Sequence, residues 1–113
     1  MKNLISSTQI VLTESMIKNG YISIDKDFFP KDTWRYKNTS RQAMLINLNI
    51  NDEYSIRTEY SIQHNGLRRL TKIRRFFDKY GITAGHIVVI MRMGLYDYKL
   101  VYDAEKRVNR KNG

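Results

Sequence analysis

The most regular pattern along this chain is an alternation of hydrophobic and polar positions between residues 53 and 62. A period of two over such a stretch is typical of a strand with one buried face. One face carries Tyr54, Ile56, Thr58 and Tyr60, and the other carries Ser55, Arg57, Glu59 and Ser61. Residues 42–50 alternate in the same way beyond Ala43, so we expect a second strand there.

Four further segments have the composition of strands. Residues 9–12 and 21–24 are short and rich in β-branched or aromatic side chains. Residues 86–91 form a near-continuous apolar run, which predicts a central strand. Residues 96–102 predict the last strand of the chain.

Turn signals separate these segments at two places. Asn51-Asp52 and His64-Asn65-Gly66 lie between predicted strands, and Asn and Gly tolerate the positive φ of tight turns. The short spacing between strands is that of hairpins rather than of strand–helix–strand units.

Helical spacing is clear only in residues 71–80. We expect Thr71 to cap this helix and Gly81 to stop it. Apolar side chains recur three or four residues apart at Leu70, Ile73, Phe76, Phe77 and Tyr80.

The remaining segments predict less regular structure. Residues 13–20 lack a capping box, so any helix there is short. Residues 27–30 predict a helical turn or loop that inserts aromatic side chains into a core. Residues 33–41 predict a polar, basic loop, and the basic tail from about residue 104 is expected to fray.

Together these elements predict one domain of residues 1–113 and a mainly β fold. About seven short strands at hairpin spacing favour a closed or half-closed antiparallel barrel with one or two short helices. No internal repeat or Gly/Ser-rich linker divides the chain.

The charge of the chain adds a partner class to this picture. The 113 residues include 20 Lys and Arg against 11 Asp and Glu, a formal net charge of +9. Such an excess favours an anionic partner, although a basic surface kept for solubility is the alternative. The chain has no cysteine, no apolar run long enough to span a bilayer and no secretory apolar stretch after Lys2. We therefore expect a soluble cytoplasmic protein without disulfides and without a membrane partner.

Residues able to carry catalysis are sparse. His64 lies at a polar turn and His86 at the start of an apolar strand, and neither has further ligands at metal spacing. Asp97-Tyr98-Lys99 is the only pattern reminiscent of a metal-dependent nuclease, and it lacks a second carboxylate on the neighbouring strand. We expect no metal, no cofactor and no catalysis by this chain alone, with a small nuclease as the alternative.

Residues able to bind nucleic acid are more numerous. Residues 66–80 hold six Arg and Lys against Asp78 alone, and hydroxyl and amide side chains precede them. Arginine suits both phosphates and guanine edges. For Arg68 and Arg69, beside a polar turn, we favour a DNA contact. For Arg74, Arg75 and Lys79, a solvated outer helix face is an equal alternative.

The order of several short motifs resembles the B-three-type DNA-binding pseudobarrel, over roughly residues 9–102. The family includes plant transcription factors and the recognition or effector domains of EcoRII-like restriction endonucleases, and the details are closer to this bacterial branch. The motifs are Leu12-Thr13-Glu14-Ser15, Asn19-Gly20-Tyr21-Ile22-Ser23-Ile24, Phe28-Phe29-Pro30, Ile73-x-x-Phe76-Phe77-x-x-Tyr80-Gly81-Ile82-x-x-Gly85-His86-Ile87-Val88-x-Ile90 and Tyr98-x-Leu100. The family usually has Gly-Asp where this chain has Gly85-His86.

The resemblance implies a seven-stranded open antiparallel pseudobarrel with two loop arms that enter the major groove. The N-arm is the loop of residues 13–19, with Ser15, Lys18 and Asn19 as candidate contacts. The C-arm is residues 58–69, with Glu59, Tyr60, Ser61, Gln63, His64, Asn65, Arg68 and Arg69 as candidates. Flanking phosphate contacts are expected from Arg35, Lys37, Arg41 and Arg57.

The resulting expectation is sequence-specific binding of double-stranded DNA, as the target-recognition or effector part of a restriction endonuclease system. A separate catalytic nuclease domain or subunit is then an expected partner. A basic module that binds RNA or an acidic protein is a further alternative, because exposed tyrosines are able to stack on unpaired bases.

Overall fold

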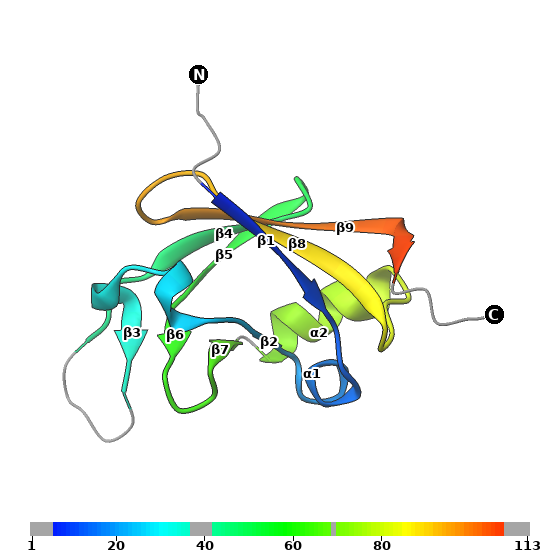
Figure 1. Cartoon of the computed structure of the whole chain (residues 1–113), viewed down its shortest axis with the longest axis horizontal. Helices are drawn as coiled ribbons and strands as arrows, with labels where there is room; N and C mark the ends of the chain where they lie inside the picture. Colours follow the sequence, from blue (N-terminus) through cyan, green and yellow to red (C-terminus); the bar gives the residue numbers. More distant parts are fainter. Residues whose placement is uncertain (1–5, 37–41, 69, 108–113) are drawn as a thin grey trace.

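A computed structural model describes residues 6–36, 42–68 and 70–107 of the chain, with backbone only at residues 68, 70 and 103–107 (Figure 1). Two β-sheets enclose one hydrophobic core, and two helices lie beside the smaller sheet.

The larger sheet has five strands in the order β1-β8-β9-β4-β5. Its members are β1 (Ser6–Val11), β8 (His86–Arg92), β9 (Asp97–Arg107), β4 (Ile46–Ile50) and β5 (Tyr54–Thr58). Neighbours are antiparallel except β4 and β9, which run parallel with Leu48 opposite Tyr98. The apolar strand β8 is hydrogen-bonded on both edges, as its sequence predicts.

The smaller sheet has four strands in the order β2-β7-β6-β3. Its members are β2 (Tyr21–Ser23), β7 (Gly66–Arg68), β6 (Tyr60–Ser61) and β3 (Trp34–Arg35). The β3–β6 pair is parallel and the other pairs are antiparallel. This sheet occupies the lower part of the molecule in Figure 1.

Two α-helices begin and end at residues suited to those positions. Helix α1 (Glu14–Asn19) is capped by Thr13, whose hydroxyl accepts a hydrogen bond from the Met16 amide at 3.2 Å. Helix α2 (Leu70–Lys79) is terminated by Gly81, which lies just beyond its last turn with a φ of 60°. There the Gly81 amide donates to Asp78 and the Ile82 amide to Phe77, the double bond of a Schellman motif.

Two short 3₁₀ turns, η1 (Lys26–Phe28) and η2 (Lys31–Thr33), lie between β2 and β3. They place Phe29 in the core, as expected for the aromatic segment of residues 27–30. No helix within the described ranges is both long and apolar enough to cross a membrane.

The core is continuous between the two sheets and α2. Its fully buried side chains come from both sheets and from the inner face of the helix. Two buried tyrosines keep their hydroxyls paired, Tyr60 to the Ile24 carbonyl at 2.6 Å and Tyr98 to the Phe28 carbonyl at 2.9 Å. Buried polar groups of this kind need such partners, since an unpaired hydroxyl is costly to desolvate.

The prediction of a mainly β fold is confirmed. The prediction of seven antiparallel strands is not. The described residues form nine strands in two mixed sheets, with no closed barrel. The regular alternation of residues 53–62 hides a break at Glu59: β5 pairs with β4 in one sheet, and β6 pairs with β7 and β3 in the other. Alternation reports which side is buried and not which neighbour a strand pairs with.

Several predicted boundaries are wrong. Residues 42–45 are not part of a strand, since the Met44 amide bonds instead to the Asp32 carbonyl. Thr71 is the second residue of α2 and therefore not its cap. The last strand, predicted to end at residue 102, continues as β9 to Arg107, which pairs with His86 across an irregularity in the ladder.

Candidate nucleic-acid interface

The predicted C-arm is a hairpin of two short strands, β6 and β7. The turn between them spans residues 62–65, and Asn65 adopts a φ of 54° there, as its sequence predicts. The Ile24 amide donates to the Asn65 carbonyl at 2.9 Å, which ties the turn to the segment after β2. The arm is therefore a held hairpin and not an extended loop.

Four polar side chains gather on the outer side of this hairpin, and we call them the readout cluster: Arg35, Glu59, Ser61 and His64. Ser61 is opposite Arg35 in the parallel β3–β6 pair, so the two side chains leave the sheet on the same side. The Arg35 Nε lies 3.8 Å from the Glu59 Oε2. The Ser61 Oγ lies 2.9 Å from the His64 Nδ1.

The cluster combines hydrogen-bond donors and acceptors beside the paired strands β3, β6 and β7. The Arg35 and Glu59 side chains are 54% and 28% exposed, so their ion pair adds roughly 0–1 kcal/mol to stability. Its main effect is to orient a guanidinium and a carboxylate beside each other. Arginine pairs with guanine edges and carboxylates accept from cytosine amines, so the arrangement can discriminate base pairs.

The prediction that Tyr60 contacts DNA is wrong. It is 1% exposed, its ring packs 5.3 Å from that of Phe29, and its hydroxyl is bonded to Ile24. It lies on the inner face of β6, between the outward Glu59 and Ser61. Gln63 and Asn65 are exposed at the turn.

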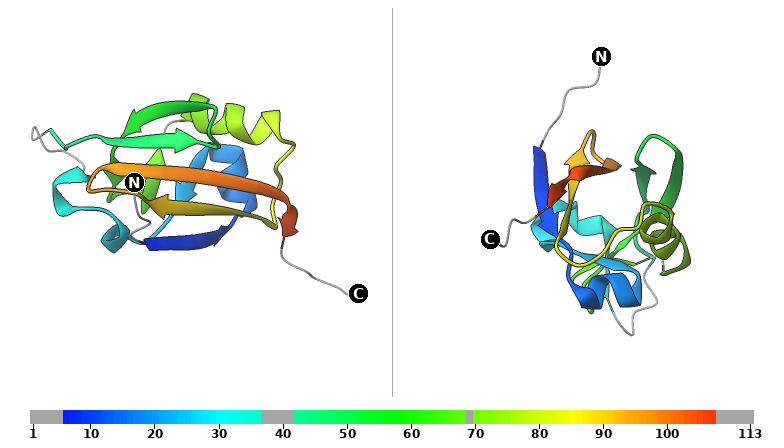
Figure 2. Two further views of the ribbon diagram at one scale, coloured as in Figure 1. Left: turned by 90° about the horizontal axis from the view of Figure 1, so that it is seen from above. Right: turned by 90° about the vertical axis from the view of Figure 1, so that its right-hand side faces the viewer.

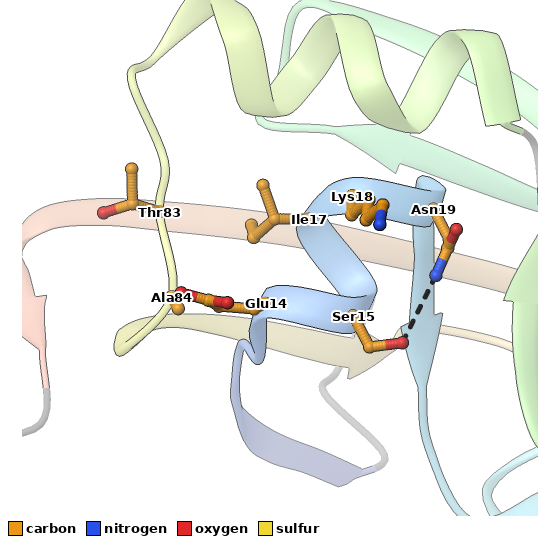
Figure 3. Close-up of a pocket in the computed structure, with 7 residues that line it drawn as sticks. All are labelled: Glu14, Ser15, Ile17, Lys18, Asn19, Thr83 and Ala84. Atoms are coloured by element: carbon orange, nitrogen blue, oxygen red, sulfur yellow. Dashed lines mark hydrogen bonds between the residues drawn. The ribbon is translucent and has the colours of Figure 1, made fainter.

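The predicted N-arm is the helix α1 rather than a loop. Its three candidate contacts, Ser15, Lys18 and Asn19, are all exposed. Figure 3 shows Asn19 turned toward Ser15, where its Nδ2 donates to the Ser15 Oγ at 3.3 Å. The Ser15 Oγ also lies 3.2 Å from the Tyr21 hydroxyl on β2.

The two arms are joined through the smaller sheet. Strand β2 follows α1 directly and pairs with β7 of the hairpin, with Ile22 opposite Leu67 and Ser23 opposite Gly66. Figure 1 and the right view of Figure 2 place α1 and the β6–β7 hairpin along the same lower edge. This ladder of backbone hydrogen bonds fixes the position of one arm relative to the other.

The expected flanking contacts are only partly described. Arg35 belongs to the readout cluster, and Arg57 is exposed on the edge strand β5. Lys37, Arg41 and Arg69 lie outside the described residues, and only the backbone of Arg68 is described.

The structure adds residues that the sequence pattern did not indicate. Thr83 and Ala84, from the loop after α2, line an open cavity of about 720 Å³ beside α1, together with Glu14, Ile17 and the three candidate contacts (Figure 3). A second cavity of about 520 Å³ lies beside the hairpin turn and is lined in part by Asp25, Lys26 and Asn65. Both depend on chain segments far apart in sequence, which no local pattern reveals.

The residues considered for catalysis have structural contacts. The His86 Nδ1 accepts a hydrogen bond from the Thr83 amide at 2.9 Å, so this histidine stabilises the turn that precedes β8. Lys99 forms an ion pair with Asp52 at 2.9 Å, and the Asp97 carbonyl accepts from two amides of the β8–β9 turn. Within the described residues, no three His, Asp or Glu side chains lie close enough to hold a metal ion.

No protein-family model matches this chain, and no curated protein matches it significantly. The fold and the arrangement of the two arms therefore carry the functional argument.

Proposed function

We propose that this protein reads a short sequence in double-stranded DNA, with the β6–β7 hairpin and α1 entering the major groove from one edge. The observation that carries this proposal is the readout cluster, a set of donors and acceptors on the sheet that also holds α1, in which Arg35 is exposed and Glu59, Ser61 and His64 are partly exposed. The net charge of +9 supports a polyanionic partner.

The proposal also includes the protein family to which the chain belongs. Two mixed sheets around one core, with arms between β1 and β2 and at β6–β7, support a variant of the B-three-type pseudobarrel. Under this proposal the chain is the recognition part of a restriction system, and a separate nuclease domain or subunit does the cutting.

Selection from random duplexes tests the proposal directly. The purified chain, mixed with methylated and unmethylated pools, should enrich one short sequence, and its affinity should fall steeply with salt. Competition with single strands and structured RNA should leave duplex binding intact. Equal binding to all duplexes, or a preference for RNA, would contradict the proposal.

Single substitutions distinguish base-specific contacts from sequence-independent electrostatic binding to DNA. Glu59→Gln should change the preference at one base pair by about 1–3 kcal/mol, because it alters an acceptor at a base edge. Lys18→Gln should weaken binding to all sequences and reduce the salt slope by about 1. Gln9→Ala, at an exposed position of β1, is the control and should change neither. Fluorescence anisotropy against the selected sequence and its point variants provides the measurement.

A further inference from the structure

Helix α2 presents a basic outer face that neither arm includes. Ile73, Phe76 and Phe77 are buried, so the helix turns its remaining side chains outward. These exposed side chains include four cations and one carboxylate: Lys72, Arg74, Arg75, Lys79 and Asp78. A groove of about 650 Å³ runs along this face between Thr71 and Lys79.

Most of this charge has no internal counter-ion. Lys79 forms an ion pair with Glu53 of the β4–β5 turn. Among the described residues, no ion pair joins Lys72, Arg74 or Arg75 to a carboxylate. Because Lys72, Arg74 and Arg75 outnumber Asp78, the face keeps a net positive charge, which attracts anions and repels itself unless a ligand compensates it.

The position of α2 connects this face to the two arms. The helix begins just after β7 of the hairpin, and it packs against α1. The right view of Figure 2 shows α2 along one side of the molecule, next to the lower edge that carries the arms. A duplex held at that edge and continued to one side would therefore approach the helix.

The chemistry of the face favours phosphates over an acidic protein. Specific protein interfaces use an apolar core with aromatic side chains, whereas contacts to a nucleic-acid backbone need only donors and positive charge. None of the exposed large apolar side chains of the described residues lies on α2; they are Val11, Tyr36, Met44, Leu45 and Leu95. Arg75 is three residues from Lys72 and four from Lys79, so the Cβ atoms of these pairs lie about 5–6 Å apart on one side of the helix.

We propose that the outer face of α2 binds the phosphate backbone of the duplex that flanks the recognised sequence. This inference rests on the proposed function, because the arms must first hold the duplex. The helix makes no base contact and lengthens the footprint on one side only.

The test compares duplex lengths. The chain should bind the selected sequence more tightly in a duplex extended by about one helical turn on each side than in a minimal duplex, because the extension adds phosphates. The Arg74→Gln/Arg75→Gln variant should lose this gain. On the extended duplex, its slope of log K against log salt should be shallower by about 2, while the minimal duplex shows no change.

A matched control removes the same charge elsewhere. Lys31→Gln/Lys99→Gln changes two cations outside α2 and both arms, and it should keep the gain from the extended duplex. Lys31, Arg74 and Arg75 are exposed, whereas Lys99 is partly buried and paired with Asp52, so a thermal melt of each variant checks that it folds.

The outcomes distinguish this inference from the proposed function. Sequence selection with no effect of Arg74→Gln/Arg75→Gln, or with an equal effect of the control, would overturn the role of α2 and leave sequence reading intact. Failure of the unaltered chain to select any duplex would overturn both. If the α2 variant keeps the full gain from the extended duplex, an acidic protein becomes the remaining candidate partner for this face.

Discussion

Gly66 shows how strongly a single residue constrains the interface. A Cβ built on this glycine would lie 2.1 Å from the Ile22 carbonyl oxygen, which belongs to the backbone of the paired strand β2. Only a residue without a side chain allows β2 and β7 to approach this closely. Since that pair joins α1 to the hairpin, both arms depend on this position.

Gly66→Ala should therefore destabilise the protein by about 2–3 kcal/mol, the upper range for overpacking a tight site. Urea unfolding monitored by circular dichroism would measure the change. Gly94→Ala is the matched control, because its new Cβ would meet only the flexible Asp97 side chain at 3.2 Å. Similar losses in both variants would show that the β2–β7 approach is not limiting.

At the scale of an element, α1 depends on its cap. The helix has six residues, and isolated helices of that length are not stable in water. The Thr13 hydroxyl holds its first turn, and Gly20 ends it with a φ of 69° while its amide donates to the Met16 carbonyl. Ser15, Lys18 and Asn19 keep their positions only as long as this short helix persists.

Thr13→Ala should cost about 1 kcal/mol of stability, the usual effect of removing an N-cap side chain. The amide of Met16 should also exchange faster with solvent, because its hydrogen-bond acceptor is lost. Thr13→Ser keeps a hydroxyl and should restore both values. Unchanged exchange at Met16 in the alanine variant would show that the cap does not hold α1.

At the scale of the whole molecule, buried tyrosines make stability sensitive to alkaline pH. Burial raises the pKa of Tyr98 to about 12, against an opposing effect of Arg92. Burial also raises the pKa of Tyr54 and Tyr60, and a hydrogen bond to Asp32 raises that of Tyr96. Below pH 10 these groups are protonated in both states. Above it the unfolded chain ionises first, so stability falls.

The fall should begin near pH 10 and continue to about pH 12, and Tyr98 alone should account for about 3 kcal/mol at most. Urea unfolding at pH 8, 10 and 11 would measure it. Tyr98→Phe should flatten the decline, whereas Tyr36→Phe, at an exposed position, should leave it intact. An equal decline in both variants would contradict the assignment to buried Tyr98.

The candidate site was only partly predictable from sequence. The turn at Asn65, the exposed Gln63 and the polar character of Glu59, Ser61 and His64 follow from local residue type. That Arg35 joins them does not, because it requires β3 to lie parallel to β6 across 26 positions of sequence. Tyr60 was misassigned because the resemblance placed it in the C-arm, although the alternation had put it on the face that Phe29 and Ile24 cover in the structure.

The sequence by itself determined the mainly β class, the tight turns, the Gly81 end of α2 and the basic character of the surface. These properties depend on residues near one another in the chain or on composition alone. Only the tertiary structure decided that the strands form two mixed sheets, that Glu59 separates them and that β2 links the two arms. Strand pairing depends on packing between distant segments, and many pairings satisfy the same alternation of buried and exposed positions.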